Sequence, residues 1–451
     1  MAGGNKKVKK AMETIATNIN DLPNEVLQYI LSFLSTREVV QTCVLSQRWC
    51  NIWKFVPTVH VTNETIQHCQ KLLDHVIMQR GDVSIDTCHL EFVKYFRREN
   101  RKANKWIFHA LSVCKVKELR VYIQFQDFFL TITNQAIISG YLRKLELDSV
   151  KLEANSLDFT SCPLLEELQM GYCIIYARKI VSKSLKRLKM ETMFFETEDD
   201  DGWPCRLHIS VPNIVSLTLL GFDGWTPLFE SMPYLAFAIV TFNDECYDTC
   251  QYSSFWDCGI EDCEGCYAIG DHLNGSVFLH HLSHTTHMEL TNDCRMNMND
   301  SISTIFDRDL KWCPLFRNLK TLLLNEWFLE NGLRGVLRIL QHSPALEKIT
   351  LKLYMEPKKI VENEESYGTM EQPFVMNHLK KISVKCQKEV MWVKKIIMTL
   401  TQFGIPHQRI CVKEIPRSSI ISEMTYLQTE HNLRMKPYKC VLSDLKAKAE
   451  R

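Results

Sequence analysis

A short apolar motif of the form Leu-x-x-Leu-x-Leu, in which Val, Ile, Met or Thr sometimes replaces Leu, recurs along most of this sequence. Alternate residues of such a motif point to one side of a β-strand, so each copy predicts a strand with one buried side. A single copy cannot bury that side alone, whereas stacked copies share a continuous core. The nine copies begin at Val116, Leu142, Leu165, Leu185, Ile214, Thr285, Leu319, Leu346 and Leu379.

Most neighbouring copies start 20 to 34 residues apart, which is close to the spacing of leucine-rich repeats. The asparagine that often follows such a strand is mostly absent, and Met232 begins one further, less regular copy. Pro163 and Pro344 would end the elements that precede two of the strands. The sequence therefore predicts an α/β fold in which irregular leucine-rich repeats over 116–372 stack into a horseshoe-shaped solenoid. A plain α/β domain is the alternative.

Stacked repeats leave an apolar face open at each end, so capping segments are expected. Residues 58–115 are predicted to cap the N-terminal end with two helices, at 65–78 and 104–113, because their apolar residues follow a helical period. Residues 373–417 are predicted to cap the C-terminal end with a strand, a helix at 390–400 and a second strand.

The N-terminal region, residues 18–57, is predicted to form three short helices. The first has one apolar stripe, made of Leu27, Ile30, Leu31 and Leu34. Ser35 and Glu38 have the spacing of a capping box at the start of the second helix. The third carries Leu45, Trp49, Ile52 and Trp53 on one face. A unit this small buries too little apolar surface to be stable alone, so it needs a partner protein or packs as a helical cap on the next domain.

The order and spacing of many residues in this region agree with a known motif. They are Asp21-Leu22-Pro23, Glu25, Leu27, Ile30-Leu31-Ser32-Phe33-Leu34, Val44-Leu45-Ser46, Arg48-Trp49 and Trp53. The region resembles the F-box of plant leucine-rich-repeat F-box proteins. The element order over 373–417 is similar to the FBD module that ends many of these proteins.

The resemblance implies binding to the Skp-type adaptor of a cullin-RING (SCF) ubiquitin ligase. The residues that it implies at or beside the adaptor are Leu22, Pro23, Ile30, Leu31, Leu34, Val44, Leu45 and Trp49. Some of them must also hold the three helices together, and the sequence does not separate the two roles. The family usually has basic residues where this chain has Gln47 and Cys50.

By the same resemblance, the chain is expected to be a substrate-recognition subunit and not an enzyme. The F-box would bind the adaptor and, through it, a cullin, while the repeats would bind an unknown target protein. The sequence has none of the common phosphate-loop, dinucleotide-binding, serine-hydrolase or zinc-protease motifs, and no cofactor is predicted. A non-degradative interaction scaffold and a zinc-dependent nucleic-acid-binding module are the alternatives.

A cysteine-rich insertion at about 243–275 fills the long gap in the repeat pattern. Cys263 and Cys266 have the spacing of a zinc-ligand pair, and Cys250 and Cys258 could complete a tetrahedral site. The neighbouring cysteines do not form the usual second pair, so free thiols in a surface loop are favoured and no metal is predicted.

Composition narrows the remaining possibilities. With 54 basic and 53 acidic residues the net charge is +1, so neither nucleic acid nor a membrane is an expected partner. The basic run at 94–105 is interpreted as a solvated helix face. No apolar stretch is long enough to cross a membrane, and 18 cysteines are too sparse for a disulfide scaffold, which predicts a cytoplasmic or nuclear protein. Residues 1–17, basic and disordered, and 418–451 are predicted to be tails.

Overall fold

The computed structural model describes most of the chain between Ile19 and Pro416. The described residues are 19–78, 80, 83–124, 129–132, 136–197, 205–242, 278–292, 309–310, 313–325, 334–353, 378–386, 391–402 and 404–416. The two predicted tails and the cysteine-rich insertion lie outside these ranges.

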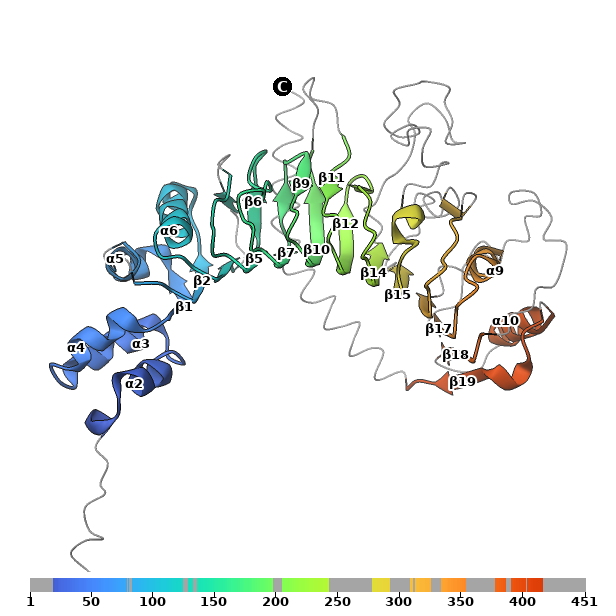
Figure 1. The fold of residues 1–451 in the computed structure, drawn as a ribbon, viewed down its shortest axis with the longest axis horizontal. Helices are drawn as coiled ribbons and strands as arrows, with labels where there is room; N and C mark the ends of the chain where they lie inside the picture. Colours follow the sequence, from blue (N-terminus) through green and yellow to red (C-terminus); the bar gives the residue numbers. More distant parts are fainter. Residues whose placement is uncertain are drawn as a thin grey trace, which may run out of the picture.

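A 16-stranded sheet, parallel throughout, forms most of the described structure (Figure 1). The strands of its main path follow one another in sequence order, so each pairs with the strands before and after it on this path. They are β1 (Thr58–Thr65), β2 (Thr87–Lys94), β3 (Glu118–Ile123), β5 (Lys144–Asp148), β7 (Glu167–Gly171), β10 (Arg187–Phe195), β12 (Ser216–Asp223), β14 (Phe237–Phe242), β15 (His287–Asn292), β16 (Thr321–Asn325), β17 (Lys348–Leu353), β18 (Lys381–Cys386) and β19 (Ile410–Glu414).

Six short strands form a second layer beside this path. Three branch from the large sheet, namely β4 (Leu130–Ile132), β6 (Val150–Leu152) and β8 (Ile174–Ile175). The other three pair with one another, namely β9 (Lys179–Val181), β11 (His208–Ser210) and β13 (Leu228–Phe229).

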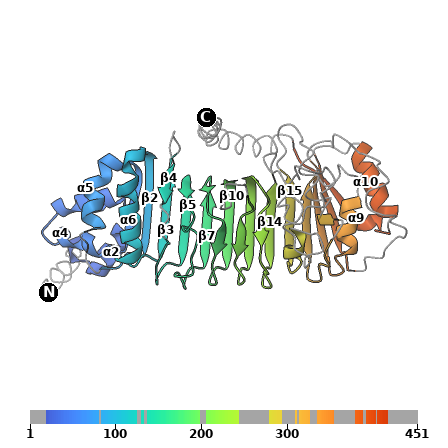
Figure 2. The ribbon, with the colours of Figure 1, turned by 90° about the horizontal axis from the view of Figure 1, so that it is seen from above.

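The molecule is an arc, and the main strands lie along its inner side (Figure 1). Seen from above, these strands lie side by side along the length of the molecule (Figure 2). The longer helices, α5 (Ile66–Val76), α6 (Asn100–Ser112), α9 (Arg334–Gln341) and α10 (Met391–Gln402), lie on the outer side. At the N-terminal end, next to β1, lie α2 (Asn24–Leu31), α3 (Thr36–Gln41) and α4 (Trp49–Ile52). Short 3-10 turns complete the structure: η1 (Ile19–Asp21), η2 (Thr42–Val44), η3 (Trp53–Phe55), η4 (Arg97–Glu99), η5 (Leu279–Leu282) and η7 (His407–Arg409).

Each of the nine motif copies forms a strand that begins two residues after the first residue of the copy, as Leu142 and Lys144 illustrate. The apolar positions are buried and alternate with less buried ones, as the strand period requires. The mixed α/β fold, with a helical N-terminal region and a parallel-strand sheet, is therefore confirmed.

The predicted frame is wrong for the irregular copy, and two strands in the same frame precede the first predicted copy. β14 follows Leu235 by two residues, so the copy starts there and not at Met232. β1 and β2 follow Val56 and Ile85 in the same frame, although the sequence predicted only helices for the N-terminal cap. Cys88 fills a core position that the pattern expects to hold leucine, and it is fully buried.

The same sharp backbone bend recurs at one level of the sheet in four consecutive units, from β5 to β12. Ser149, Tyr172, Thr192 and Gly221 all have a positive φ, between 50° and 73°. Each comes directly after a residue at the same level of the paired strands, which are Asp148, Gly171, Glu191 and Leu220. This conformation suits glycine and is uncommon for the other three residues, so its repetition marks structurally equivalent positions.

One apolar core runs from the N-terminal helices to the last strand, with Leu27 and Ile405 near its two ends. Every cysteine within the described ranges is a free thiol, and burial raises the pKa of Cys88 to about 12. In the same part of the chain, no helix is both long enough and apolar enough to span a bilayer.

Candidate protein-interaction surfaces

The three N-terminal helices, which with their connecting turns form the N-terminal module (residues 19–57), are held together by the Arg48-Trp49 pair. The Arg48 guanidinium donates to the backbone carbonyls of Asn20 and Leu22 and to Asn24 Oδ1, the last at 2.7 Å. Trp49 Nε1 donates to Asn20 Oδ1 at 2.7 Å, and its ring is buried. These bonds tie η1 and the start of α2 to α4.

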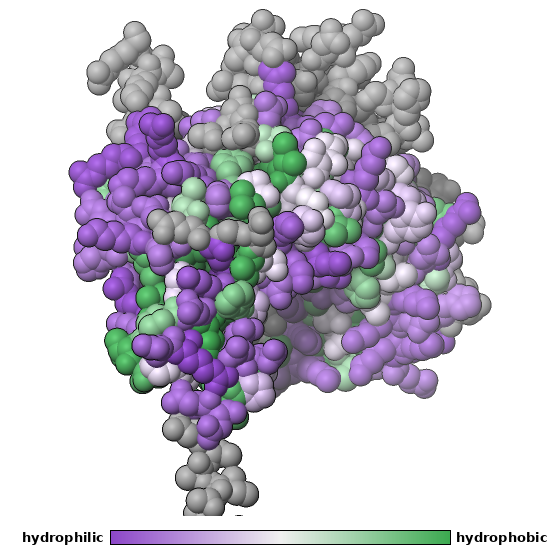
Figure 3. All heavy atoms as spheres, turned by 60° about the vertical axis from the view of Figure 1, so that its left-hand side comes forward, coloured by the Kyte–Doolittle hydropathy of each residue, from purple (hydrophilic) through white to green (hydrophobic). Residues whose placement is uncertain are grey.

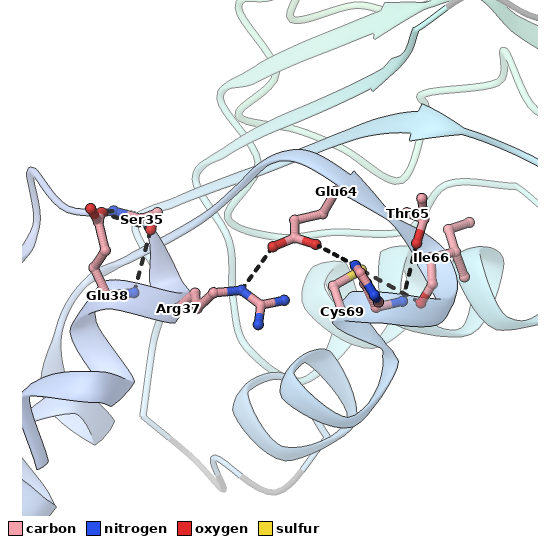
Figure 4. A network of polar contacts seen from close by, with 8 residues as sticks. Ser35, Arg37, Glu38, Glu64, Thr65, Ile66 and Cys69 are labelled. Carbon is pink, nitrogen blue, oxygen red and sulfur yellow. Dashed lines mark hydrogen bonds and ion pairs between the residues drawn. The ribbon is translucent and has the colours of Figure 1, made fainter. Parts of the chain in front are cut away.

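The predicted capping box at the start of α3 is present (Figure 4). Glu38 N–H donates to Ser35 Oγ at 3.4 Å, and Ser35 N–H donates to Glu38 Oε2 at 2.8 Å. The Ser35 hydroxyl also donates to this carboxylate, which lowers the pKa of Glu38. The box fixes the helix start because it satisfies backbone donors that the first turn leaves unpaired.

Polar contacts fasten the N-terminal module to the first strand of the sheet. Arg37 Nε lies 2.8 Å from Glu64 Oε1, at the end of β1 (Figure 4). His60 N–H donates to Thr36 Oγ1 at 2.8 Å, and the Thr58 hydroxyl donates to the Ser32 carbonyl at 3.2 Å. Together with the shared core, these bonds give the module a fixed position relative to the strands.

The eight residues expected near the adaptor divide into three groups. Leu31 and Trp49 are buried, 1% and 2% exposed, and belong to the core of the module. Leu22 and Leu34 are half-buried and pack against that core. The exposed residues are Pro23, Ile30, Val44 and Leu45, with Val44 at 88% and Leu45 at 59% exposure.

Three further exposed apolar residues were missed by the sequence analysis. Val26, Tyr29 and Phe33 join Ile30 at positions i, i+3, i+4 and i+7, which places them along one side of α2 and the turn after it. Phe33 is 70% exposed, and its ring meets that of Tyr29 edge-on with centroids 5.0 Å apart. Helix α2 therefore has two apolar sides, one in the core and one facing solvent.

The surface view agrees with this division. Figure 3 brings the N-terminal end forward, and apolar side chains gather there in the lower part of the face. Exposed apolar surface of this kind marks an interaction site in a soluble protein. Gln47 and Cys50, where the chain departs from the F-box pattern, are both exposed on the same module.

A second surface is the inner face, which we define as the side chains that alternate with the buried ones along β2 to β19. Over β3 to β10 it carries alternating charges that neutralise one another. Arg120 lies 3.4 Å from Glu146, which also binds Lys144 at 2.6 Å and so raises the pKa of that lysine. Lys144 in turn lies 3.9 Å from Glu167, which accepts a hydrogen bond from Arg187.

The inner face changes character along the array. Over β12 to β16 it carries the apolar side chains Leu220, Phe237, Ile239 and Leu323, and on β15 the carboxylate of Glu289, which lies 2.9 Å from His287 Nε2. Over β17 to β19 its charged residues are all lysines, namely Lys348, Lys352, Lys381, Lys385 and Lys413.

The zinc candidates Cys250, Cys258, Cys263 and Cys266 lie outside the described residues. Within the described part of the chain, no group of three or more His, Cys, Asp or Glu side chains is placed to hold a metal ion.

The module matches a known family. A family model for the F-box domain matches residues 19–59, so the N-terminal module contains an F-box domain. The Arabidopsis thaliana F-box/LRR-repeat protein At5g02930 is 25% identical over 364 residues, which cover 74% of this chain and 72% of the relative.

Two further relatives from Arabidopsis thaliana carry similar names. F-box/LRR-repeat protein At5g38396 is 21% identical over 418 residues, covering 80% of this chain and 88% of the relative. F-box/LRR-repeat protein At2g42720 is 27% identical over 247 residues, and the match spans about half of its length, 52%. The expected resemblance to plant F-box/leucine-rich-repeat proteins is thereby confirmed.

Proposed function

We propose that this chain is the substrate-recognition subunit of an SCF-type ubiquitin ligase, with the N-terminal module binding a Skp-type adaptor and, through it, a cullin. The observation that carries the proposal is the exposure of Ile30, Phe33, Val44 and Leu45 on a module whose own core is already complete. Burying these side chains against a partner would remove a large apolar area from water. Each Å² of apolar surface buried in this way would stabilise the complex by about 25 cal/mol.

We infer that the strand array is a leucine-rich-repeat solenoid that binds the target protein. Three features support this inference: the constant two-residue offset between motif and strand, the strictly sequential pairing, and the bend repeated in four units. An arc of this kind offers an extended inner face to a partner. The division into F-box, caps at 58–115 and 373–417, and repeats at 116–372 stays a prediction.

The proposed role needs no catalytic residue in this chain. A receptor of this kind holds the target beside a separate enzyme that transfers ubiquitin. It acts by raising the effective concentration of the target at that enzyme. The fixed attachment of the module to β1 suits this role, because it sets the distance between adaptor and target. We also propose that the chain acts in the cytoplasm or nucleus, as its sparse cysteines suggest.

The test uses the purified full-length chain and a Skp-type adaptor. The variant Val44→Asp/Leu45→Asp should bind the adaptor at least about a hundredfold more weakly, since both side chains are exposed and would bury a charge in the interface. The control is Tyr234→Asp, because Tyr234 is 65% exposed but lies on the strand array. Unchanged binding by the double variant would contradict the proposal.

Leu31 and Trp49 are poor choices for this test although the resemblance places them near the adaptor. Both are core residues, so their replacement by alanine would cost about 2 to 5 kcal/mol of stability whether or not they contact a partner. A non-degradative scaffold is distinguished from a receptor by target turnover in a reconstituted ligase. Turnover that survives Val44→Asp/Leu45→Asp would contradict the receptor role.

A further inference from the structure

The lysines of the last strands lie at matching levels of the sheet. Lys352 of β17 is paired in register with Lys385 of β18, and Lys385 with Lys413 of β19. Four residues earlier on the same strands, Lys348 is paired with Lys381. Neighbouring strands are about 4.8 Å apart and each residue advances about 3.3 Å. The five lysines, which we call the lysine ladder, therefore lie on a patch of the inner face about 10 Å wide and about 13 Å long.

No carboxylate belongs to this patch among the described residues. The inner-face positions between the lysines hold Thr350, Ser383 and Cys411. Those of the adjacent strand β16 are Thr321, Leu323 and Asn325, which carry no charge. Glu347 pairs with Lys380 just before these strands, and Glu414 follows Lys413 and so faces the other side of β19.

Such a ladder is unfavourable for folding alone. Like charges directly opposite one another on neighbouring strands destabilise a sheet, whereas opposite charges stabilise it. The same inner face alternates its charges over β3 to β10, whereas no carboxylate among the described residues neutralises the lysines of β17 to β19. The lysines are therefore better explained by an anionic partner than by stability.

We propose that the lysine ladder binds an acidic segment of the target protein, rich in Asp and Glu, whose neighbouring apolar residues contact Leu323 on β16. The proposal rests on the proposed function in one respect, namely that the target lies on the inner face. A protein segment fits better than nucleic acid because the basic patch is short. Beyond it the face carries Glu289 on β15, and farther along the basic residues are already paired with Glu146 and Glu167, so a long polyanion would find no further positive surface.

The experiment measures binding of fluorescein-labelled decaglutamate to the full-length chain, with and without a Skp-type adaptor, by fluorescence anisotropy. Decaglutamine is the neutral probe and decathymidine the nucleic-acid probe. We expect decaglutamate to bind at least about tenfold more tightly than decaglutamine, with affinity that falls as salt rises.

The variant Lys352→Glu/Lys385→Glu should lower the affinity for decaglutamate at least about tenfold, because it replaces attraction by repulsion. The matched control is Arg97→Glu/Arg101→Glu, which reverses two exposed charges at η4 and α6 on the outer side. Circular dichroism and adaptor binding of both variants should equal those of the parent chain.

Three outcomes would overturn the proposal. These are equal binding of decaglutamate and decaglutamine, equal loss in the control variant, and tighter binding of decathymidine through the same lysines, which would assign the patch to nucleic acid. Adaptor binding is read on the same samples. If the parent chain binds decaglutamate but does not bind the adaptor, the proposed function is contradicted and this inference still stands.

Discussion

The inner face of β3 to β10 and that of β17 to β19 are built on the same backbone pattern but carry their charges differently. In the first region Glu146 and Glu167 alternate with basic residues across four strands. In the second, Lys352, Lys385 and Lys413 stand side by side with no described carboxylate among them. The buried sides of the two regions are alike, since both are filled by aliphatic side chains.

The contrast separates what holds the array together from what it offers to a partner. Buried aliphatic residues stabilise every unit in the same way, so they say little about binding. The charge pattern of the inner face is free to vary because exposed ion pairs contribute only about 0 to 1 kcal/mol each. We therefore regard β3 to β10 as a self-neutralised scaffold and β17 to β19 as the region that recognises a target.

The largest effect should come from the cores, where the two regions should respond equally. Leu168→Ala in β7 and Leu351→Ala in β17 should each lower the free energy of unfolding by about 2 to 5 kcal/mol, because both residues are fully buried. Urea denaturation measures this. Gln169→Ala on the inner face is the control, expected within about 0.5 kcal/mol of the parent. A negligible loss for Leu351→Ala would mean that the last strands are not packed as the others are.

A smaller loss is expected when the scaffold region is given the charge pattern of the other region. Glu167→Lys removes the partner of Arg187 and places a third positive charge beside Lys144, so stability should fall by about 1 to 2 kcal/mol at low salt. Glu167→Gln should lose roughly half as much, since it removes attraction without adding repulsion. If Glu167→Lys is as stable as the parent chain, the charge pattern of β3 to β10 does not contribute to stability.

The reverse change should stabilise the recognising region. Lys385→Glu converts two like-charge contacts, with Lys352 and Lys413, into two attractive ones, which should add about 0.5 kcal/mol at low salt and nothing at high salt. Binding of decaglutamate should weaken in the same variant. Thermal unfolding at two salt concentrations measures the gain, and a loss of stability would contradict the view that the lysines oppose folding.

The last prediction concerns pH at the N-terminal end of the inner face. Burial, followed by the neighbouring His60 and Arg120, lowers the pKa of His89 to about 4. An unfolded imidazole has a pKa of about 6.5, so between these values the unfolded chain binds more protons and stability falls as pH falls. Melting temperature should thus drop modestly from pH 7 to pH 5, and less in His89→Gln. An equal drop in that variant would assign the effect to other groups.

Much of the fold could be predicted from local pattern alone. The motif located nine strands because alternation of apolar residues depends only on nearby sequence, and the Ser35–Glu38 capping box was visible for the same reason. β2 was missed because Cys88 fills a leucine position, and β14 was misplaced because Ala238 does so. In both cases burial depends on fit to the neighbouring units and not on the residue type that the motif expects.

The candidate surfaces were only partly predictable. The sequence showed that α2 is apolar, but it assigned Ile30 and Leu31 to one stripe, whereas the structure buries Leu31 and leaves Ile30 with Tyr29 and Phe33 on the exposed side. Which apolar residues face the core depends on how α2 packs against α4 and the Arg48-Trp49 pair. That packing joins residues more than 20 positions apart.

By itself, the sequence determined the strand period, the start of α3 and the presence of the F-box motif, because each is recognised from the order of nearby residues. Only the tertiary structure decided that Lys352, Lys385 and Lys413 meet, since 27 to 32 residues separate them along the chain and register between strands brings them level. The physical reason is that side-chain alternation is local, while the pairing that selects neighbours is set by burial of the shared core.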